Sequence, residues 1–253
     1  MTSARFQIEQ HTLPNGLRVV LQPDRSLPLV AINLWYHVGS KNEVPGRTGL
    51  AHLFEHMLFQ GSQHVGKNDH FRLVQQVGGV ANGSTWFDRT NYYETLPAHC
   101  LSLGLWLESD RMGFFLPALD TEKLENQREV VMNERRQRVE NQPYGLAFER
   151  LNEALFPDEY PYHWPVIGYM DDIAAADQED VEKFFRAFYT PDNAVLTLAG
   201  HFDPDEALGL VETYFGSIPR GGDRSDVTVA LADEPLGELV TLDDDVQLPR
   251  VYT

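Results

Sequence analysis

Hydrophobic positions along the chain fall into short runs with either strand-like or helix-like spacing. Residues 6–23 form two extended apolar stretches around a Pro-Asn-Gly turn signal, which predicts a β-hairpin. Residues 29–38 are rich in β-branched and aromatic side chains and predict a third strand. Residues 49–61 are apolar on nearly every side, which is typical of a helix buried inside a domain. Thr48 and Gly61 are its predicted N-cap and C′ residues.

The rest of the chain continues as helices and paired strands. Periodicity and turn signals predict helices over residues 68–77, 98–114, 121–139, 146–156, 177–189 and 204–215. They predict strands over residues 80–86, 90–96 and 194–199, the first two as a second hairpin. Because neighbouring strands come as hairpins, and strand and helix do not alternate regularly, the order favours a mostly antiparallel sheet over a doubly wound one.

Composition limits the classes of function. The formal net charge is −18, from 20 Lys and Arg against 38 Asp and Glu, which argues against nucleic acid and anionic membrane surfaces as partners. Cys100 is the single cysteine, so neither an internal disulfide nor a cysteine-based zinc cluster is expected. No apolar run of membrane-spanning length and no signal-peptide core is visible, so the chain as given is expected to be soluble, with a trimmed export signal left open.

Candidate chemistry is concentrated in the apolar run 49–61. Two imidazoles and a carboxylate in such a setting are costly to bury unless something binds them, and a metal ion satisfies all three. On a helix, His52 and His56 project about 40° apart and one turn apart in height, so both rings can reach one ion. Glu55 projects about 60° to the other side of His52, beside such an ion rather than on it.

The motif carries a family resemblance. H-L-F-E-H, in the setting G-L-A-H-L-F-E-H-M-L-F-Q-G, is similar to the H-x-x-E-H of the inverzincin peptidases. Its flanks resemble the M16 family, which includes pitrilysin, insulin-degrading enzyme and the mitochondrial processing peptidase. The resemblance spans residues 6–219 and implies an α+β domain, a two-layer sandwich with a mostly antiparallel sheet and helices packed on one face. It also implies zinc-dependent peptide hydrolysis with Glu55 as general base.

A third zinc ligand is expected from a later helix. Glu134 lies one turn beyond Val131 on the apolar side of the helix predicted to begin at Thr121. Two histidines with one glutamate form an accepted catalytic zinc set. The context of Glu134 resembles the M16 segment that carries the family's distal glutamate ligand. Many M16 members also carry a glutamate seven residues earlier, thought to support the site, and Gln127 stands there in this chain.

Substrate binding is expected along residues 82–85. Asn82, Gly83 and Ser84 are small or polar where a packed strand favours Val or Ile, which alone indicates only a loosely packed edge strand. The segment resembles the N-A-x-T edge strand on which M16 enzymes hold an extended peptide by main-chain hydrogen bonds, with Gly83 in place of the family's Ala. Phe59, one turn beyond His56, either packs in the core or lines the pocket for the residue after the cut.

Domain organisation follows from composition and resemblance together. Residues 1–219 are expected to form an M16-like amino-terminal catalytic domain. Residues 220–253 begin with a Gly-, Asp-, Arg- and Ser-rich linker and are expected to continue into a second homologous domain that is cut short here. Expected partners are therefore a peptide or small protein substrate and a second M16-like domain or subunit, without which the fragment is expected to show little activity.

Other readings stay open at this point. One is a non-catalytic scaffold or partner-binding subunit, because the fold family includes members that have lost the metal motif. Another is a metal-dependent lyase resembling the LuxS type, with Cys100 as third ligand. His163 is not nominated as a ligand, because it lies in a loop with no partner at ligand spacing. The sequence does not distinguish Zn²⁺ from Mn²⁺ or Co²⁺.

Overall fold

The computed structural model describes residues 7–222, 224, 227 and 240–252, and its centre is one six-stranded sheet. The strand order is β1-β2-β6-β3-β5-β4. The β2–β6 pair is parallel and the other neighbouring pairs are antiparallel, so the sheet is mostly antiparallel as expected. The strands are β1 (Glu9–Thr12), β2 (Arg18–Pro23), β3 (Leu29–Tyr36), β4 (Val80–Thr85), β5 (Thr90–Pro97) and β6 (Ala194–Gly200).

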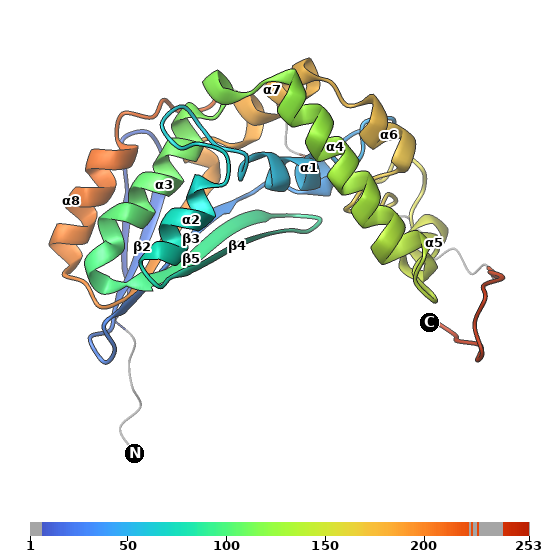
Figure 1. Cartoon of the computed structure of the whole chain (residues 1–253), viewed down its shortest axis with the longest axis horizontal. Coiled ribbons are helices and arrows are strands. Elements are labelled where there is room, and N and C mark those ends of the chain that lie inside the picture. Colours follow the sequence, from blue (N-terminus) through green and yellow to red (C-terminus); the bar gives the residue numbers. More distant parts are fainter. Residues whose placement is uncertain (1–6, 223, 225–226, 228–239, 253) are drawn as a thin grey trace.

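Helices cover one face of this sheet and extend past one end of it (Figure 1). The helices are α1 (Leu50–Met57), α2 (Asp69–Gln76), α3 (Leu101–Phe114), α4 (Thr121–Arg135), α5 (Ala147–Leu155), α6 (Met170–Ala175), α7 (Gln178–Phe188) and α8 (Pro204–Phe215). The expected two-layer α+β sandwich is therefore confirmed.

Alternation along β3 shows which face the helices cover. Val30, Ile32, Leu34 and Tyr36 are buried, whereas Trp35 on the opposite face is 41% exposed. A period of two with one buried face is what an antiparallel strand shows when helices pack on one side only. The core therefore lies between the sheet and the helices.

The last strand of the sequence, β6, lies in the middle of the sheet. β6 pairs with β2 on one side and with β3 on the other, so residues near position 200 lie between strands formed by the first 36. Asn15, in the β1–β2 turn, donates from Nδ2 to the carbonyls of Phe215 at 2.8 Å and Ile218 at 3.0 Å. Residues up to Ile218 therefore belong to the same folded unit as the amino-terminal hairpin.

Several predicted helix boundaries were wrong. The sequence predicted Thr121 as the N-cap of α4, but Asp120 holds that position, and its carboxylate accepts from the Lys123 amide at 2.7 Å. Helix α1 ends at Met57, before Gly61, which adopts a positive φ of 100° in the following loop. Helix α6 was not predicted, because six residues carry too little periodicity.

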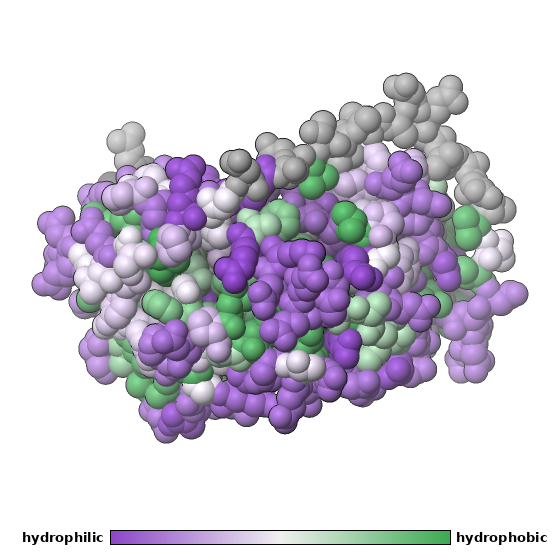
Figure 2. All heavy atoms as spheres, turned by 90° about the horizontal axis from the view of Figure 1, so that it is seen from above, coloured by the Kyte–Doolittle hydropathy of each residue, from purple (hydrophilic) through white to green (hydrophobic). Residues whose placement is uncertain are grey.

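The face seen in Figure 2 is largely hydrophilic, with hydrophobic side chains in scattered groups. This agrees with a charge-rich chain whose acidic residues are solvated. Among the described residues, no helix combines the length and the apolar character that crossing a membrane requires. Much of the expected linker and second-domain start, residues 228–239, lies outside the described residues.

Candidate metal centre

The start of α1 is fixed by a carboxylate from the preceding loop. Glu43 accepts from the backbone amides of Gly49 and Ala51, each at 2.8 Å. Gly49 is the N-cap residue with φ of 86°, where a Cβ atom would lie 2.7 Å from the Ile167 carbonyl oxygen. The predicted N-cap, Thr48, is wrong: its hydroxyl donates to Asp172 at 2.7 Å instead. Glu43 thus satisfies helix amides that would otherwise be buried without partners.

Helices α1 and α4 bring His52, His56 and Glu134 together. Glu134 Oε2 lies 3.2 Å from His56 Nε2 and 3.8 Å from His52 Nε2. The centroids of the two imidazole rings are 4.8 Å apart, as expected for histidines one turn apart on one helix. One ligand atom from each residue can be chosen so that all three lie within 4.8 Å of one another.

The protonation states of His52 and Glu134 favour the binding of a cation. Burial lowers the pKa of His52 to about 4, and the nearby His56 acts in the same direction. The hydrogen bond from His56 is the largest influence on Glu134 and lowers the pKa of its carboxyl. At neutral pH the group therefore offers a neutral His52 imidazole and a Glu134 carboxylate, the forms that bind metal.

The donor set fits zinc. Two imidazole nitrogens and one carboxylate oxygen match a known catalytic zinc set, and three protein ligands leave a position for water or substrate. The side chains of His52, His56 and Glu134 are 14%, 23% and 17% exposed, so the group is sheltered yet open to solvent on one side. The assignment of these three residues as zinc ligands stays a prediction.

The second oxygen of Glu134 has a cationic partner. Arg138 Nη1 lies 2.6 Å from Glu134 Oε1, so the two carboxylate oxygens face different groups. Arg138 belongs to a π-helical turn, Arg136–Glu140, that directly follows α4. Such turns are rare in proteins overall, but those that occur are often at functional sites. Neither the turn nor the ion pair was anticipated, because a π-helical turn has no clear sequence signal.

Glu55 lies beside the group, against strand β4. Thr85 donates its hydroxyl to Glu55 Oε2 at 2.6 Å. Burial is the largest influence on Glu55 and raises the pKa of its carboxyl, while the Thr85 hydrogen bond lowers it. The contact with Thr85 was not predicted, because it joins residues that are distant in sequence.

The expected peptide-binding segment forms an edge of the sheet, since β4 pairs only with β5 among the strands that the structure describes. Asn82 Oδ1 accepts from the Gly83 amide at 2.9 Å, and the Ser84 hydroxyl donates to Asn91 at 2.8 Å. Phe59 stacks on Phe71 with ring centroids 4.5 Å apart, and one of its ring carbons would lie 3.2 Å from a Cβ atom at Gly83.

Gln127 is buried, and its Nε2 donates to Asn126 Oδ1 at 3.0 Å. In the described part of the chain, no hydrogen bond links Gln127 to His52, His56 or Glu134. Cys100 is partly buried and packs against the core at the N-cap of α3. His163 Nδ1 lies 2.7 Å from the Phe156 carbonyl oxygen, within its own loop.

A second cluster of possible ligands was missed by sequence reasoning. His70, Glu94 and Glu108 also have ligand atoms within 4.8 Å of one another, and all three are buried. Arg111 already lies among them, paired with Glu108 and 3.1 Å from His70 Nε2. Because a guanidinium supplies positive charge there, this cluster reads as a buried ion-pair network. Its members come from α2, β5 and α3, which no local motif connects.

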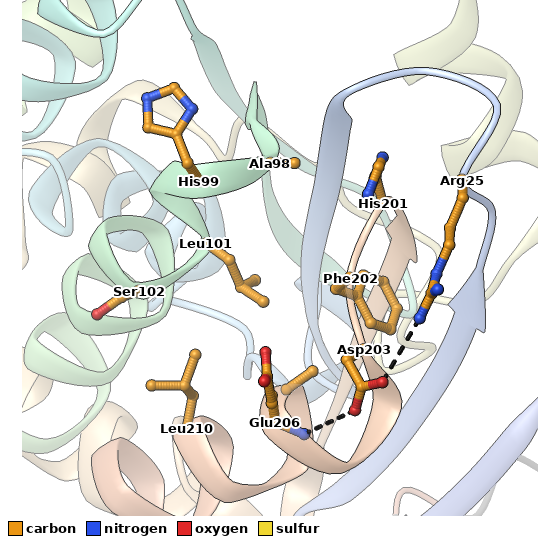
Figure 3. A pocket seen from close by; sticks show the side chains of 11 residues that line it. Arg25, Ala98, His99, Leu101, Ser102, His201, Phe202, Asp203, Glu206 and Leu210 are labelled. Carbon is orange, nitrogen blue, oxygen red and sulfur yellow. Dashed lines mark hydrogen bonds and ion pairs between the residues drawn. The ribbon is translucent and has the colours of Figure 1, made fainter.

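A separate hollow of about 510 Å³ lies between the start of α3, the start of α8 and the β2–β3 turn (Figure 3). Its polar lining residues are Arg25, His99, Ser102, His201, Asp203 and Glu206. None of them belongs to the group around His52. Asp203 caps α8 and accepts from Arg25, so its carboxylate is already engaged.

The family model described as insulinase, peptidase family M16, matches residues 18–163, and the model described as peptidase M16 inactive domain matches residues 175–253. The zinc protease PqqE of Helicobacter pylori is 34% identical over 211 residues, covering 83% of this chain and 47% of that protein. The beta subunit of the mitochondrial processing peptidase of Blastocladiella emersonii is 27% identical over 237 residues, covering 90% and 50%.

The fold agrees with these matches. The crystal structure of a protease from Helicobacter pylori superposes with a TM-score of 0.83 at 33% identity, covering 88% of this chain and 53% of that one. Pitrilysin superposes with a TM-score of 0.79 at 22% identity, which shows a shared fold. The chain spans about half the length of the curated relatives it matches. By its matching family model and its fold, the chain belongs to the insulinase family, peptidase family M16.

Proposed function

We propose that this chain is the catalytic half of a zinc-dependent endopeptidase or oligopeptidase. The observation that carries the proposal is the position of Glu134 Oε2, 3.2 Å from His56 Nε2 and 3.8 Å from His52 Nε2 on another helix. The names of relatives, among them the zinc protease of Helicobacter pylori, support a zinc peptidase.

Each residue has a distinct part in the proposed reaction. His52, His56 and Glu134 hold the metal. When bound, zinc supplies a Lewis acid that polarises the scissile carbonyl and makes an attacking water more acidic. Glu55 accepts the proton of that water and then donates it to the leaving amine. Partial burial raises the pKa of the Glu55 carboxyl above its ordinary value, which makes it a stronger base toward the attacking water.

The substrate is proposed to be a peptide or small protein that adds a strand to β4. An edge strand leaves one row of backbone amides and carbonyls unpaired, and these can hydrogen-bond to an extended peptide. Asn82, Gly83 and Ser84 lie on this strand, and Gly83 lies next to both Glu55 and Phe59. The scissile bond would thus pass close to Glu55, with Phe59 lining the space for the residue after the cut.

Residues 1–219 are proposed to form one domain, and residues 220–253 to lead into a second. Support comes from β6, which lies between β2 and β3, and from the hydrogen bonds of Asn15 to Phe215 and Ile218. Because the chain spans about half the length of its relatives, a second M16-like domain or subunit is the proposed partner. It would supply the remaining wall of the substrate chamber.

Two alternatives differ in what they require. A non-catalytic scaffold would not need Glu55, and the match of residues 175–253 to the family model described as peptidase M16 inactive domain supports that alternative. A lyase of the LuxS type would need Cys100 near the histidines. Within the described residues, the group of donor atoms containing His52 and His56 is completed by Glu134 instead.

The test is Glu55→Gln in the full-length protein. The variant should retain zinc, because Glu55 is not a proposed ligand, and should lose nearly all peptide hydrolysis. A variant that cleaves peptides as fast as the parent would show that Glu55 is not the general base. Zinc bound without any hydrolysis by the parent would favour the scaffold reading.

A further inference from the structure

The Glu55 carboxylate contacts two positions of strand β4. Thr85 donates to Oε2 at 2.6 Å. A Cβ atom at Gly83 would lie 3.1 Å from Glu55 Cγ and 3.2 Å from Oε1. Because side chains alternate along a strand, positions 83 and 85 face the same side, toward α1. The carboxylate thus lies across two same-face positions of a single strand.

The intervening residue of β4 is directed elsewhere. Ser84 donates its hydroxyl to Asn91 at 2.8 Å and accepts from Arg89. Its hydroxyl is therefore engaged with the neighbouring strand β5 and the β4–β5 turn rather than with α1. Ser84 and Thr85 both carry a hydroxyl, and it is the Thr85 hydroxyl that contacts Glu55.

We propose that Thr85 is a positioning residue for Glu55 and that Gly83 provides the space which this position requires; the inference rests on the peptidase function proposed above. The terminal torsion of a glutamate is broad, so a carboxylate without a fixed partner samples many orientations. The Thr85 hydroxyl holds Oε2 and leaves Oε1 to accept the proton of the attacking water. A fixed orientation raises the fraction of encounters that lead to reaction.

Gly83 has a steric part in this arrangement. A Cβ atom there would also lie 3.2 Å from Phe59 Cε2, so a methyl group would press on Glu55 and Phe59 together. Contacts this close require one of the neighbours to move. Glycine therefore lets Glu55 settle directly against β4, within reach of Thr85. The same edge strand would bind the peptide and orient the base that acts on it.

The experiment compares hydroxyl-free and hydroxyl-bearing side chains at position 85 in the zinc-loaded full-length protein. Thr85→Val and Thr85→Ala remove the hydroxyl, and Thr85→Ser retains it. Thr95→Val, on β5 at the far end of the same hairpin, is the matched control. For each variant kcat, KM, zinc content and thermal unfolding are measured. Two hydroxyl-free variants are used so that a folding defect in one leaves the other to decide.

We expect kcat of Thr85→Val and Thr85→Ala to fall by about 10-fold or more, with KM and zinc content within about twofold of the parent. The kcat of Thr85→Ser should lie within about threefold of the parent value, because serine keeps the hydroxyl donor. Thr95→Val should match the parent.

Three results would overturn the inference: a parental kcat in either hydroxyl-free variant, a Thr85→Ser variant as slow as Thr85→Val, or loss of zinc with the hydroxyl. Failure of the proposed function is a different outcome, recognised by parental turnover in Glu55→Gln.

Discussion

Glu134 Oε2 lies 3.2 Å from His56 Nε2, although the two residues belong to different helices, α4 and α1. The two side chains are therefore close enough to bind one cation between them. The same oxygen is 3.8 Å from His52 Nε2, so the three side chains point to one common position.

Removal of any one ligand should lower the metal content. His52→Ala and Glu134→Gln leave two protein donors, which hold zinc far more weakly than three. Elemental analysis of protein dialysed against metal-free buffer measures the effect, with about one equivalent expected in the parent and about one tenth or less in each variant. Glu129→Gln, an exposed carboxylate on the same helix as Glu134, is the control and should retain about one equivalent.

Metal removal should weaken the fold without abolishing it. The core between sheet and helices does not include His52, His56 or Glu134, so the chelated protein should still unfold cooperatively. Zinc added at about 100 times its dissociation constant should raise the free energy of unfolding by about 2.7 kcal/mol, because it binds the folded state. Chemical unfolding with and without chelator measures this. Complete unfolding by the chelator would contradict a preformed site.

Glu43→Ala should destabilise the protein through the start of α1. The variant leaves the amides of Gly49 and Ala51 without their acceptor in a buried setting. Loss of such a cap costs about 1–2 kcal/mol of the free energy of unfolding. Urea unfolding measures the cost, and Glu129→Ala should stay within about 0.5 kcal/mol of the parent. An unchanged midpoint in Glu43→Ala would mean that this cap contributes nothing.

Stability should depend on pH through the buried cluster around Glu94. Burial, with the nearby Glu108, raises the pKa of Glu94 to about 8 from an ordinary value of 4.5, while Arg111 acts in the opposite direction. A raised pKa means that the folded state holds a proton which the unfolded state has released. The contribution of protonated Glu94 to the free energy of unfolding is therefore present in full below about pH 4.5. It is lost as the pH rises through about 8.

Glu94→Gln tests that dependence, because glutamine cannot titrate. His70, Glu108 and Arg111 also face this position, so the comparison is between parent and variant rather than with a theoretical curve. The free energy of unfolding of the parent should fall more steeply than that of the variant between about pH 5 and pH 8. Parallel curves would show that Glu94 does not change its protonation in this range.

Local sequence patterns were enough to predict most of the helices and strands. Both early hairpins and the helix carrying His52 and His56 form where alternation and helical spacing indicated them. The grouping of Glu134 with those histidines was also expected, from its place on the apolar side of its helix and from the family resemblance. The elements are readable because each depends on neighbours within one segment. The grouping of Glu134 with the histidines joins two separate helices, so it could be expected only with the help of the family resemblance.

Contacts between distant segments were not predictable in the same way. The insertion of β6 between β2 and β3 depends on pairing across most of the chain, which no local periodicity encodes. Glu43 caps α1 from outside the helix, whereas the sequence pointed to the adjacent Thr48. The contact of Thr85 with Glu55 appears only once β4 lies beside α1.

The most direct test of the central claim is diffraction from crystals of the zinc-loaded protein, recorded on both sides of the zinc absorption edge. The account predicts an anomalous peak about 2.0–2.2 Å from a nitrogen of His52, a nitrogen of His56 and a carboxylate oxygen of Glu134. A peak that leaves Glu134 outside the coordination sphere, or one located at His70, Glu94 and Glu108 instead, would contradict it.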